Sequence, residues 1–244
     1  SALQVIGDIT LVATAQQFGG FTLPELDKVL LPYVLKSEAA ALEKFRQMGV
    51  ADDVAREFAV KETVRELEQG FQSLELKLNT VPCSRGDFAF TTITFGQWKP
   101  ENYTASEREW LSTISRTMLR VRKKGHGRHG KPVVFPKLVY LYDRDQIAND
   151  KPSAELFDEA LRTSAECMYP DYLSLSSESG SVSQIYQRYG AITSPMGCRA
   201  FLSLWKNEEG QAITVGRCNI GAVSLNLPII LKITQMQRPD DWRE

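Results

Sequence analysis

Strand-like segments that alternate with helix-like segments constrain the fold of this chain more than any other feature of its sequence. Residues 88–95 have the β-branched and aromatic composition of a strand, which Gly96 ends. Residues 132–142 predict a second strand, with Pro136 at an edge or a bulge. The segment 104–122 between them has helical spacing, and strands joined through a helix run parallel. The order of elements therefore predicts an α/β fold.

The first part of the chain, residues 1–78, is predicted to be mainly helical. Thr22 offers a capping hydroxyl and Glu25 follows three positions later, so this pair predicts the start of a helix. Gly49 is the predicted end of that helix. A long helix is then predicted over residues 52–78, and its many Glu, Lys and Arg residues indicate a mostly solvated surface.

The remainder, residues 79–244, is predicted to hold strands, helices and loops. Residues 153–167 predict a helix and residues 172–175 a short strand. The apolar run 220–233 predicts a last strand, buried on both faces inside a sheet. About four strands are predicted in all, at the low end for a sheet that must be covered on both faces. We therefore expect a single domain over residues 1–244 that is an internal section of a larger protein.

Composition narrows the class of protein. The 244 residues carry 29 Lys and Arg against 30 Asp and Glu, and this balance argues against a dedicated DNA-binding module. No apolar run approaches the roughly 20 residues of a membrane span, and Asp8 interrupts the N-terminal apolar segment. The four cysteines are scattered, with no pair at the spacing of a zinc or thioredoxin-like motif. We expect a cytoplasmic protein with no nucleic-acid or membrane partner and no metal site in this chain.

The first candidate site surrounds Cys198. Pro195 and Gly197 impose a turn that would present the thiol at a loop tip, next to Arg199. A neighbouring guanidinium lowers the pKa of a thiol and can hold an anionic substrate group. Met196 could help to shield the site from water. From the residues alone, a buried structural cysteine in a tight turn is the favoured alternative.

Two further segments could contact a substrate. Asn219 lies between two glycines at the start of the apolar run, where it is either a ligand contact or a turn residue. Cys218 beside it is interpreted as a small buried side chain rather than a second functional thiol. Asn79 and Ser84 belong to a polar turn that leads into the first predicted strand. Substrate contacts and ordinary loop hydrogen bonds remain open for both.

A basic glycine-rich loop lies between residues 120 and 131 and contains the two histidines of the chain, His126 and His129. It has no aromatic residues on which bases could stack, and it lacks the P-loop pattern. We interpret it as a solvated hairpin or a mobile loop. The histidines could bind a metal only by recruiting carboxylates from elsewhere, and the sequence shows no such partners.

Taken together, these segments resemble the anaerobic (class III) ribonucleoside-triphosphate reductases, which are glycyl-radical enzymes. The likeness runs through nearly the whole chain, and its most specific part is a P-M-G-C-R segment followed by a G-R-x-N-x-G segment. The matching pieces, in chain order, are Gly19–Asp27, Leu31–Val34, Asn79–Arg85, Thr91–Phe95, Phe135–Val139, Tyr169–Asp171, Ser194–Arg199, Gly216–Asn219 and Asn226–Pro228.

The resemblance implies a fold and a site. The family fold is a ten-stranded α/β barrel of the glycyl-radical enzyme type, of which this chain would supply about half together with long N-terminal helices. A finger loop inside the barrel carries a cysteine that becomes a thiyl radical and takes the ribose 3′-hydrogen. That cysteine corresponds to Cys198, and Asn219 would hydrogen-bond the ribose hydroxyls. The remaining residues expected around the substrate are Arg199, Asn79, Ser84 and Met196.

The resemblance also implies partners. The substrate would be a ribonucleoside triphosphate, formate the usual reductant, and a radical-SAM enzyme the activator of a homodimer. The radical-storing glycine and a four-cysteine zinc site of the family have no counterpart in this sequence, so we expect this section alone to be inactive. Two alternatives remain: a different glycyl-radical enzyme, such as a formate-lyase-like acyltransferase, and a noncatalytic nucleotide-binding domain.

Overall fold

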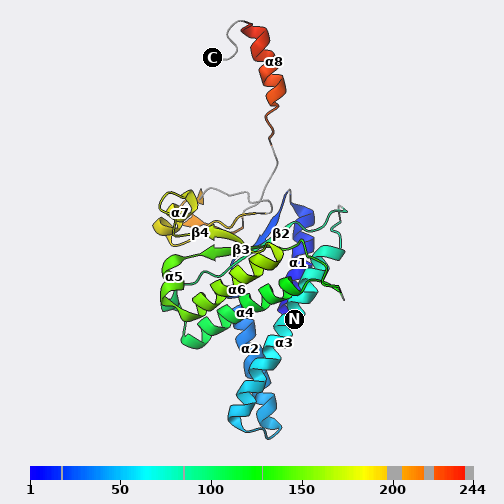
Figure 1. Ribbon diagram of the computed structural model, residues 1–244, viewed down its shortest axis with the longest axis vertical. Helices are drawn as coiled ribbons and strands as arrows, with labels where there is room; N and C mark the ends of the chain where they lie inside the picture. Colours follow the sequence, from blue (N-terminus) through cyan, green and yellow to red (C-terminus); the bar gives the residue numbers. More distant parts are fainter. Residues whose placement is uncertain (18, 85, 128, 197–204, 217–222, 240–244) are drawn as a thin grey trace.

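Four parallel strands form the central sheet of the protein, which confirms the predicted α/β class. The computed structural model describes residues 1–17, 19–84, 86–127, 129–196, 205–216 and 223–239. The strands lie side by side in chain order, and each pairs in parallel with the next (Figure 1). They are β1 (Phe21–Leu23), β2 (Thr91–Phe95), β3 (Lys137–Tyr142) and β4 (Asp171–Ser174).

Helices connect these strands and extend the chain at both ends (Figure 1). A short antiparallel pair, β5 (Trp205–Lys206) and β6 (Ala212–Ile213), lies beyond the sheet in the sequence. No described helix is both long and apolar enough to cross a bilayer. The helices are α1 (Ala2–Gln16), α2 (Leu26–Gln47), α3 (Asp52–Thr80), α4 (Ala105–Lys124), α5 (Arg144–Asn149), α6 (Lys151–Cys167), α7 (Ser181–Tyr189) and α8 (Leu227–Gln237), with a 3-10 turn at Pro100–Asn102.

One face of the sheet is covered by helices, and the main core lies there. In Figure 1, α4 and α6 run side by side across the sheet. Ile93 and Phe95 of β2 stand in register with Leu138 and Tyr140 of β3, and all four side chains are buried in the core that includes Leu111 of α4. Because successive strand residues alternate between the two faces, the residues between them point to the opposite side of the sheet. That opposite side carries the candidate site.

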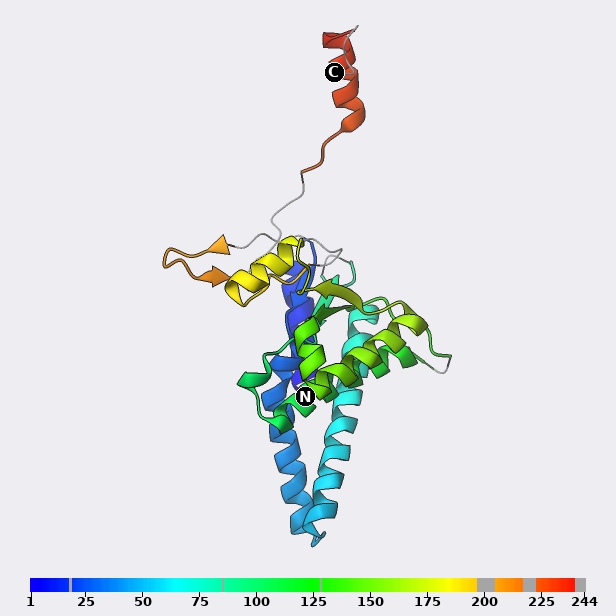
Figure 2. The same ribbon diagram turned by 60° about the vertical axis from the view of Figure 1, so that its left-hand side comes forward.

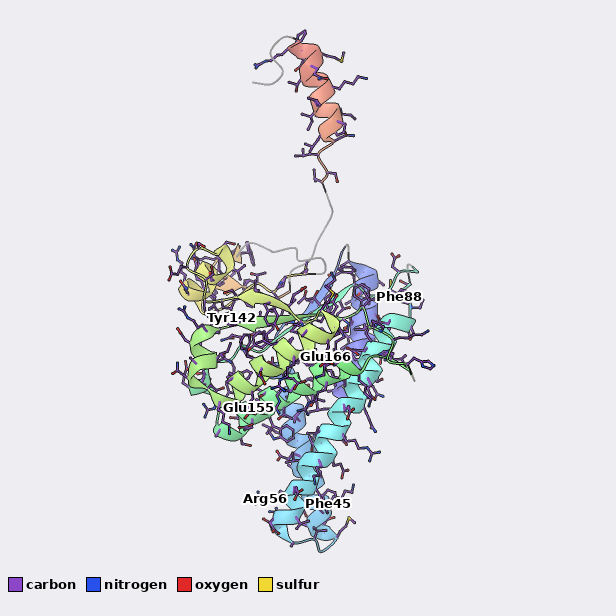
Figure 3. The ribbon with its side chains drawn as sticks, in the orientation of Figure 1. Phe45, Arg56, Phe88, Tyr142, Glu155 and Glu166 are labelled. Carbon is purple, nitrogen blue, oxygen red and sulfur yellow. The ribbon has the colours of Figure 1, made fainter. Side chains whose placement is uncertain are left out.

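The two longest helices, α2 and α3, form a hairpin that projects from the sheet (Figure 2). Figure 3 places Phe45 and Arg56 near the tip of this hairpin. The Phe45 ring packs against Phe58, with the ring centroids 5.6 Å apart. The predicted helix end at Gly49 is confirmed, since that residue follows the last turn of α2 with a φ of +76°. The predicted helix 52–78 is confirmed as α3.

The predicted capping role of Thr22 is wrong. Thr22 lies in the short strand β1, and its hydroxyl donates to the carbonyl oxygen of Pro195, 2.8 Å away. The helix begins later, at Leu26, and Glu25 occupies its N-cap position with a φ of +47°. The sequence pattern of a capping box is present, but the Thr22 hydroxyl bonds to Pro195 instead of to the start of the helix.

The predicted strand 220–233 is also wrong for the part that the structure describes. Residues 220–222 lie outside the described ranges, and the apolar residues from Leu227 onward form α8. Asn226 caps this helix by accepting a hydrogen bond from the Ile229 backbone N–H at 3.1 Å. An apolar run of this length fits a buried strand or a helix equally well by composition, and the Asn cap with Pro228 in the first turn favours the helix.

A buried carboxyl group, that of Asp27, ties the start of α2 to the end of β2. Its two oxygens accept hydrogen bonds from the backbone N–H groups of Gly96 (2.8 Å) and Lys28 (3.0 Å). The Ser115 hydroxyl of α4 lies 3.3 Å from the same carboxylate. The residue is 1 % exposed, and this burial raises the pKa of Asp27 from 3.8 to about 6.

The raised pKa predicts a pH dependence of stability. Folded Asp27 keeps its proton at pH values where the unfolded chain has lost it, so the stability it contributes is complete below pH 3.8 and is lost as the pH rises to about 6. A shift of this size corresponds to about 3 kcal/mol. Part of this change lies below pH 4, so in Asp27→Asn the free energy of unfolding should fall about 2 kcal/mol less between pH 4 and pH 6.5, as measured by urea denaturation.

A matched control is Asp52→Asn at the exposed start of α3. Hydrogen bonding to Arg46 lowers the pKa of Asp52, so its contribution changes only below pH 3.8. The slope between pH 4 and pH 6.5 should match that of the unmodified protein. An Asp27→Asn protein with the original slope would show that another group titrates there.

Candidate functional site

Three threonine hydroxyls gather on the sheet face opposite α4 and α6. Thr22 of β1 stands in register with Thr92 of β2, and Thr94 lies two residues further along β2 on the same face. Thr92 and Thr94 are buried, and the Thr92 hydroxyl has no hydrogen-bond partner among the described residues. This face is therefore polar although water is excluded from it.

The segment 192–196 lies across these hydroxyls. Ile192 packs in a small apolar cluster with Leu141 of β3. Thr22 Oγ1 donates to Pro195 O at 2.8 Å, and Thr94 Oγ1 lies 3.1 Å from Ser194 Oγ. The two contacts join residues that are 173 and 100 positions apart in the sequence. Met196 follows Pro195 directly in the chain and is buried.

A cavity of about 320 Å³ adjoins this segment. Its size is in the range of pockets that hold small organic ligands. The cavity brings the segment before residue 197 together with the segment before residue 217, although a two-stranded hairpin separates them in the chain. Its lining includes Phe21, Thr22, Thr193, Ser194, Met196 and Gly216.

Three of the predicted site residues, Cys198, Arg199 and Asn219, lie outside the described residues, as does Cys218. The described residues that precede them in the two motifs are Met196 and Gly216, and both line the cavity. The structure thus brings the two predicted motifs to one place as far as it describes them. Met196 is the predicted site residue that it puts there.

Asn79 and Ser84 occupy a different place. The Asn79 side chain donates to the carbonyl oxygens of Glu75 (2.6 Å) and Phe135 (2.5 Å) and accepts from the Phe135 N–H (3.1 Å). It therefore fastens the end of α3 to the segment before β3. Ser84 is exposed in the turn that follows α3. The described lining of the cavity includes neither residue.

The carboxyl ends of the strands carry a second polar network. Lys28 Nζ donates to Gln97 Oε1 at 3.1 Å, and Gln97 Nε2 donates to the Tyr186 hydroxyl at 2.7 Å. That hydroxyl in turn lies 3.2 Å from Asp143, and burial raises the pKa of Tyr186. The network locks α7 to the sheet beside a cavity of about 240 Å³.

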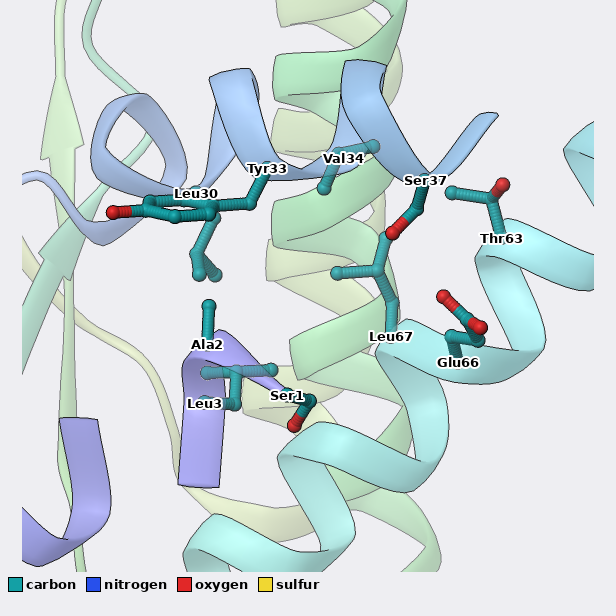
Figure 4. Close-up of a pocket in the computed structure, with 10 residues that line it drawn as sticks. All are labelled: Ser1, Ala2, Leu3, Leu30, Tyr33, Val34, Ser37, Thr63, Glu66 and Leu67. Carbon is teal, nitrogen blue, oxygen red and sulfur yellow. The ribbon is translucent and has the colours of Figure 1, made fainter. Parts of the chain in front are cut away.

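Another cavity lies far from the strand ends, between the first residues of α1 and the helices α2 and α3 (Figure 4). Its volume is only about 60 Å³, too small for a nucleotide, and Leu30, Val34 and Leu67 point toward it. We interpret it as a packing gap between three helices.

The basic loop is tied to acidic residues of the helices. Lys123 Nζ lies 3.3 Å from Glu159, and Lys124 Nζ lies 3.4 Å from Glu68. His126 Nε2 lies 3.5 Å from the buried Glu75 carboxylate. Lys123 and Lys124 thus have acidic partners within the chain. In the described part of the chain, no group of three or more His, Cys, Asp or Glu side chains could hold a metal ion.

The threonines that support the segment before Met196 were not among the predicted site residues. A signal existed: in the run 91–95, hydroxyl-bearing Thr92 and Thr94 alternate with apolar Ile93 and Phe95. This alternation predicts one polar and one apolar face for the strand.

Comparison with known proteins gives a consistent result. The sequence model of a family described as "Anaerobic ribonucleoside-triphosphate reductase" matches residues 1–240. Proteins of that name from Enterobacteria phage T4 and Escherichia coli are 35% and 34% identical to this chain, over 94% and 100% of its length. The aligned regions cover 36% and 32% of those two proteins, so the chain spans about a third of the relatives that it matches.

Proposed function

The chain belongs to the anaerobic ribonucleoside-triphosphate reductase family, and from this premise we propose that it is the section of such an enzyme that carries the reacting cysteine and part of the ribose site. The observation that carries the proposal is the cavity beside the polar sheet face. It adjoins Met196, two residues before Cys198, and Gly216, three residues before Asn219. Both family motifs therefore approach the same small-molecule-sized space.

We further propose that β1 to β4 are consecutive strands of a closed barrel and supply four of its ten strands. Two observations support this. The strands follow one another in chain order without the reversal that marks a doubly wound sheet. The core helices also cover one face, as the outer layer of a barrel does, whereas the other face receives a loop segment.

The chemistry proposed for Cys198 is removal of a hydrogen atom from the ribose. The radical-storing glycine, which we place outside this chain, supplies the unpaired electron. The Cys198 sulfur radical then forms an S–H bond as the C3′–H bond breaks, which leaves the radical on the sugar carbon. The 2′-hydroxyl departs as water after protonation, and formate supplies two electrons and a proton as it is oxidised to CO₂. The Cys198 S–H bond then returns its hydrogen atom to C3′, which restores the sulfur radical. A C3′–H bond is not acidic enough for general-base chemistry, which explains a site with so few imidazoles.

The remaining residues have supporting roles in this proposal. Asn219 hydrogen-bonds the ribose hydroxyls, and Arg199 attracts an anionic group of the substrate. Met196 helps to exclude water, which would otherwise quench a reactive intermediate. Ser84 is proposed to contact the substrate from its exposed turn. Because the Asn79 amide is already bonded to Phe135, its contribution would be indirect, through the segment before β3.

The test is an anoxic assay of the full-length protein with a radical-SAM activating enzyme, formate and ribonucleoside triphosphates. We expect deoxyribonucleoside triphosphate and one CO₂ per turnover, and no product from residues 1–244 alone. Transfer of an acyl group without nucleotide reduction would favour the formate-lyase-like alternative. Nucleotide binding without any reaction would favour the noncatalytic domain.

A further inference from the structure

We propose that Thr22 and Thr94 are positioning residues, whose hydroxyls hold the segment 194–195 at a fixed height over the sheet and thereby set the position from which Cys198 reacts. This inference rests on the proposed function. Thr22 and Thr94 lie in two of the segments that match the family, but the resemblance assigns neither residue a role. Both act on the site through the segment that precedes it.

The two hydrogen bonds join separate strands to adjacent residues of one loop. Thr22 of β1 donates to Pro195 O at 2.8 Å, and Thr94 of β2 lies 3.1 Å from Ser194 Oγ. A single bond would allow the segment to pivot, whereas two bonds from neighbouring strands fix both its height and its direction. Cys198 follows three residues after Pro195, and a chain spans at most about 3.5 Å per residue, so little chain separates the bonds from the cysteine.

The Thr94 hydroxyl has a second partner. The Glu25 backbone N–H donates to Thr94 Oγ1 at 2.9 Å, and in the Thr94–Ser194 contact either hydroxyl can donate. Ser194 also lines the cavity. The chain of bonds thus runs from the start of α2 through β2 to the cavity wall.

Packing within the strand does not by itself favour hydroxyls on this face of the sheet. Thr94 is fully buried and Thr92, with no partner among the described residues, is 1 % exposed. Valine has nearly the same shape, suits a strand at least as well and avoids the cost of burying a hydroxyl. A buried strand face that carries threonine instead of valine is explained when the hydroxyls hold something other than the sheet. The Thr94 hydroxyl contacts Ser194 and the Glu25 N–H, and the Thr22 hydroxyl contacts Pro195.

The experiment uses the full-length reductase with the single variants Thr22→Val and Thr94→Val. Thr22→Val leaves the Pro195 carbonyl oxygen without this partner, and Thr94→Val removes the partner of Ser194 Oγ and also that of the Glu25 N–H. Loss of these bonds is expected to shift the loop. Because a misplacement of about 1 Å can cost about 100-fold in rate, we expect kcat to fall about 10- to 100-fold while KM changes less than about threefold. The glycyl radical, quantified by electron paramagnetic resonance, should form to its normal level. The isotope effect on kcat with 3′-deuterated substrate should rise.

Two controls separate positioning from a general loss of structure. Thr94→Ser keeps the hydroxyl and should restore the rate to within about threefold. Thr163→Val removes another buried hydroxyl, which bonds the Glu159 carbonyl inside α6 at 2.7 Å, and should leave kcat and the isotope effect unchanged. Rates within twofold of the unmodified enzyme for both threonine variants would overturn the proposal. An equal loss in Thr163→Val, or loss of the glycyl radical together with the rate, would overturn it as well.

Failure of the proposed function gives a different result. In that case the unmodified enzyme makes no deoxynucleotide, or Cys198→Ala retains activity. If Cys198→Ala is inactive while both threonine variants react at the normal rate, the proposed function stands and the positioning role alone is wrong.

Discussion

Replacing Cys198 by alanine in the full-length enzyme is expected to reduce deoxynucleotide formation at least about 1000-fold, because alanine has no S–H bond through which a hydrogen atom could be exchanged with the ribose. The glycyl radical should still form, because the glycine that carries it is proposed to lie outside this chain. The measurement is the rate of deoxynucleotide formation beside the electron paramagnetic resonance signal of the same sample. Together they separate failure of activation from failure of the chemical step.

Cys167→Ala provides the matched control for Cys198→Ala. Its thiol lies at the last turn of α6, 3.3 Å from the Thr163 carbonyl oxygen, and is partly exposed. Its removal should leave the rate within about twofold, since surface substitutions rarely change stability by more than about 0.5 kcal/mol. If Cys198→Ala keeps more than about a tenth of the activity, another group carries the radical and the assignment of Cys198 is wrong.

The elements whose signals are local were predictable from the sequence. A capping box opens α4, and its Thr-x-x-Glu pattern is visible in the sequence at Thr104 and Glu107. Thr104 Oγ1 accepts from the Glu107 N–H at 3.2 Å, and the Glu107 carboxylate accepts from the Thr104 N–H at 2.8 Å. The same pattern failed at Thr22, whose hydroxyl bonds to a carbonyl 173 positions away. A capping motif thus predicts a helix start only where no distant partner competes for the hydroxyl.

The segments that form the site were predictable from the sequence, but the residues that hold one of these segments in place were not. Motif spacing pointed to the segments around Met196 and Gly216, and the structure brings these two residues to one cavity. The bonds from Thr22 and Thr94 depend on which strands become neighbours. No spacing within the sequence reports that, so these residues were outside the reach of motif analysis.

Charged residues on α3 show the same limit. The composition of residues 52–78 predicted a mostly solvated helix surface, yet Glu75 is 2 % exposed. Arg122, from the basic segment expected to be a solvated or mobile loop, is equally buried at the end of α4. Each residue looks like a surface charge on its own. Their burial follows from pairing with each other, 47 positions apart.

The Glu75–Arg122 pair should have a large effect on stability. Arg122 Nε donates to Glu75 Oε1 at 2.8 Å, and Arg122 Nη2 donates to Pro136 O at 2.5 Å. Burial raises the pKa of the Glu75 carboxyl, and the charge of Arg122 is the strongest influence opposing that rise. Arg122→Met would leave this carboxylate buried without its guanidinium. We expect the free energy of unfolding of the chain to fall by about 3–5 kcal/mol, as measured by urea denaturation.

An exposed ion pair is the natural comparison for Arg122→Met. Lys61 and Glu57 lie 2.5 Å apart on α3, and their side chains are 66% and 63% exposed. Exposed pairs contribute about 0–1 kcal/mol, so Lys61→Met should change the free energy of unfolding by less than about 1 kcal/mol. A loss of similar size in both variants would mean that burial does not set the cost at Arg122.

The double variant Glu75→Met/Arg122→Met tests why the single change is costly. If the cost is an unpaired buried charge, removing the second charge should restore most of the lost stability, because apolar side chains of similar volume pack without desolvation of a charge. If the cost instead comes from the bond to Pro136, which Arg122 alone provides, the double variant should be as unstable as the single one. The pair joins α3, α4 and the segment before β3, and this comparison determines whether charge pairing or that backbone bond holds the three together.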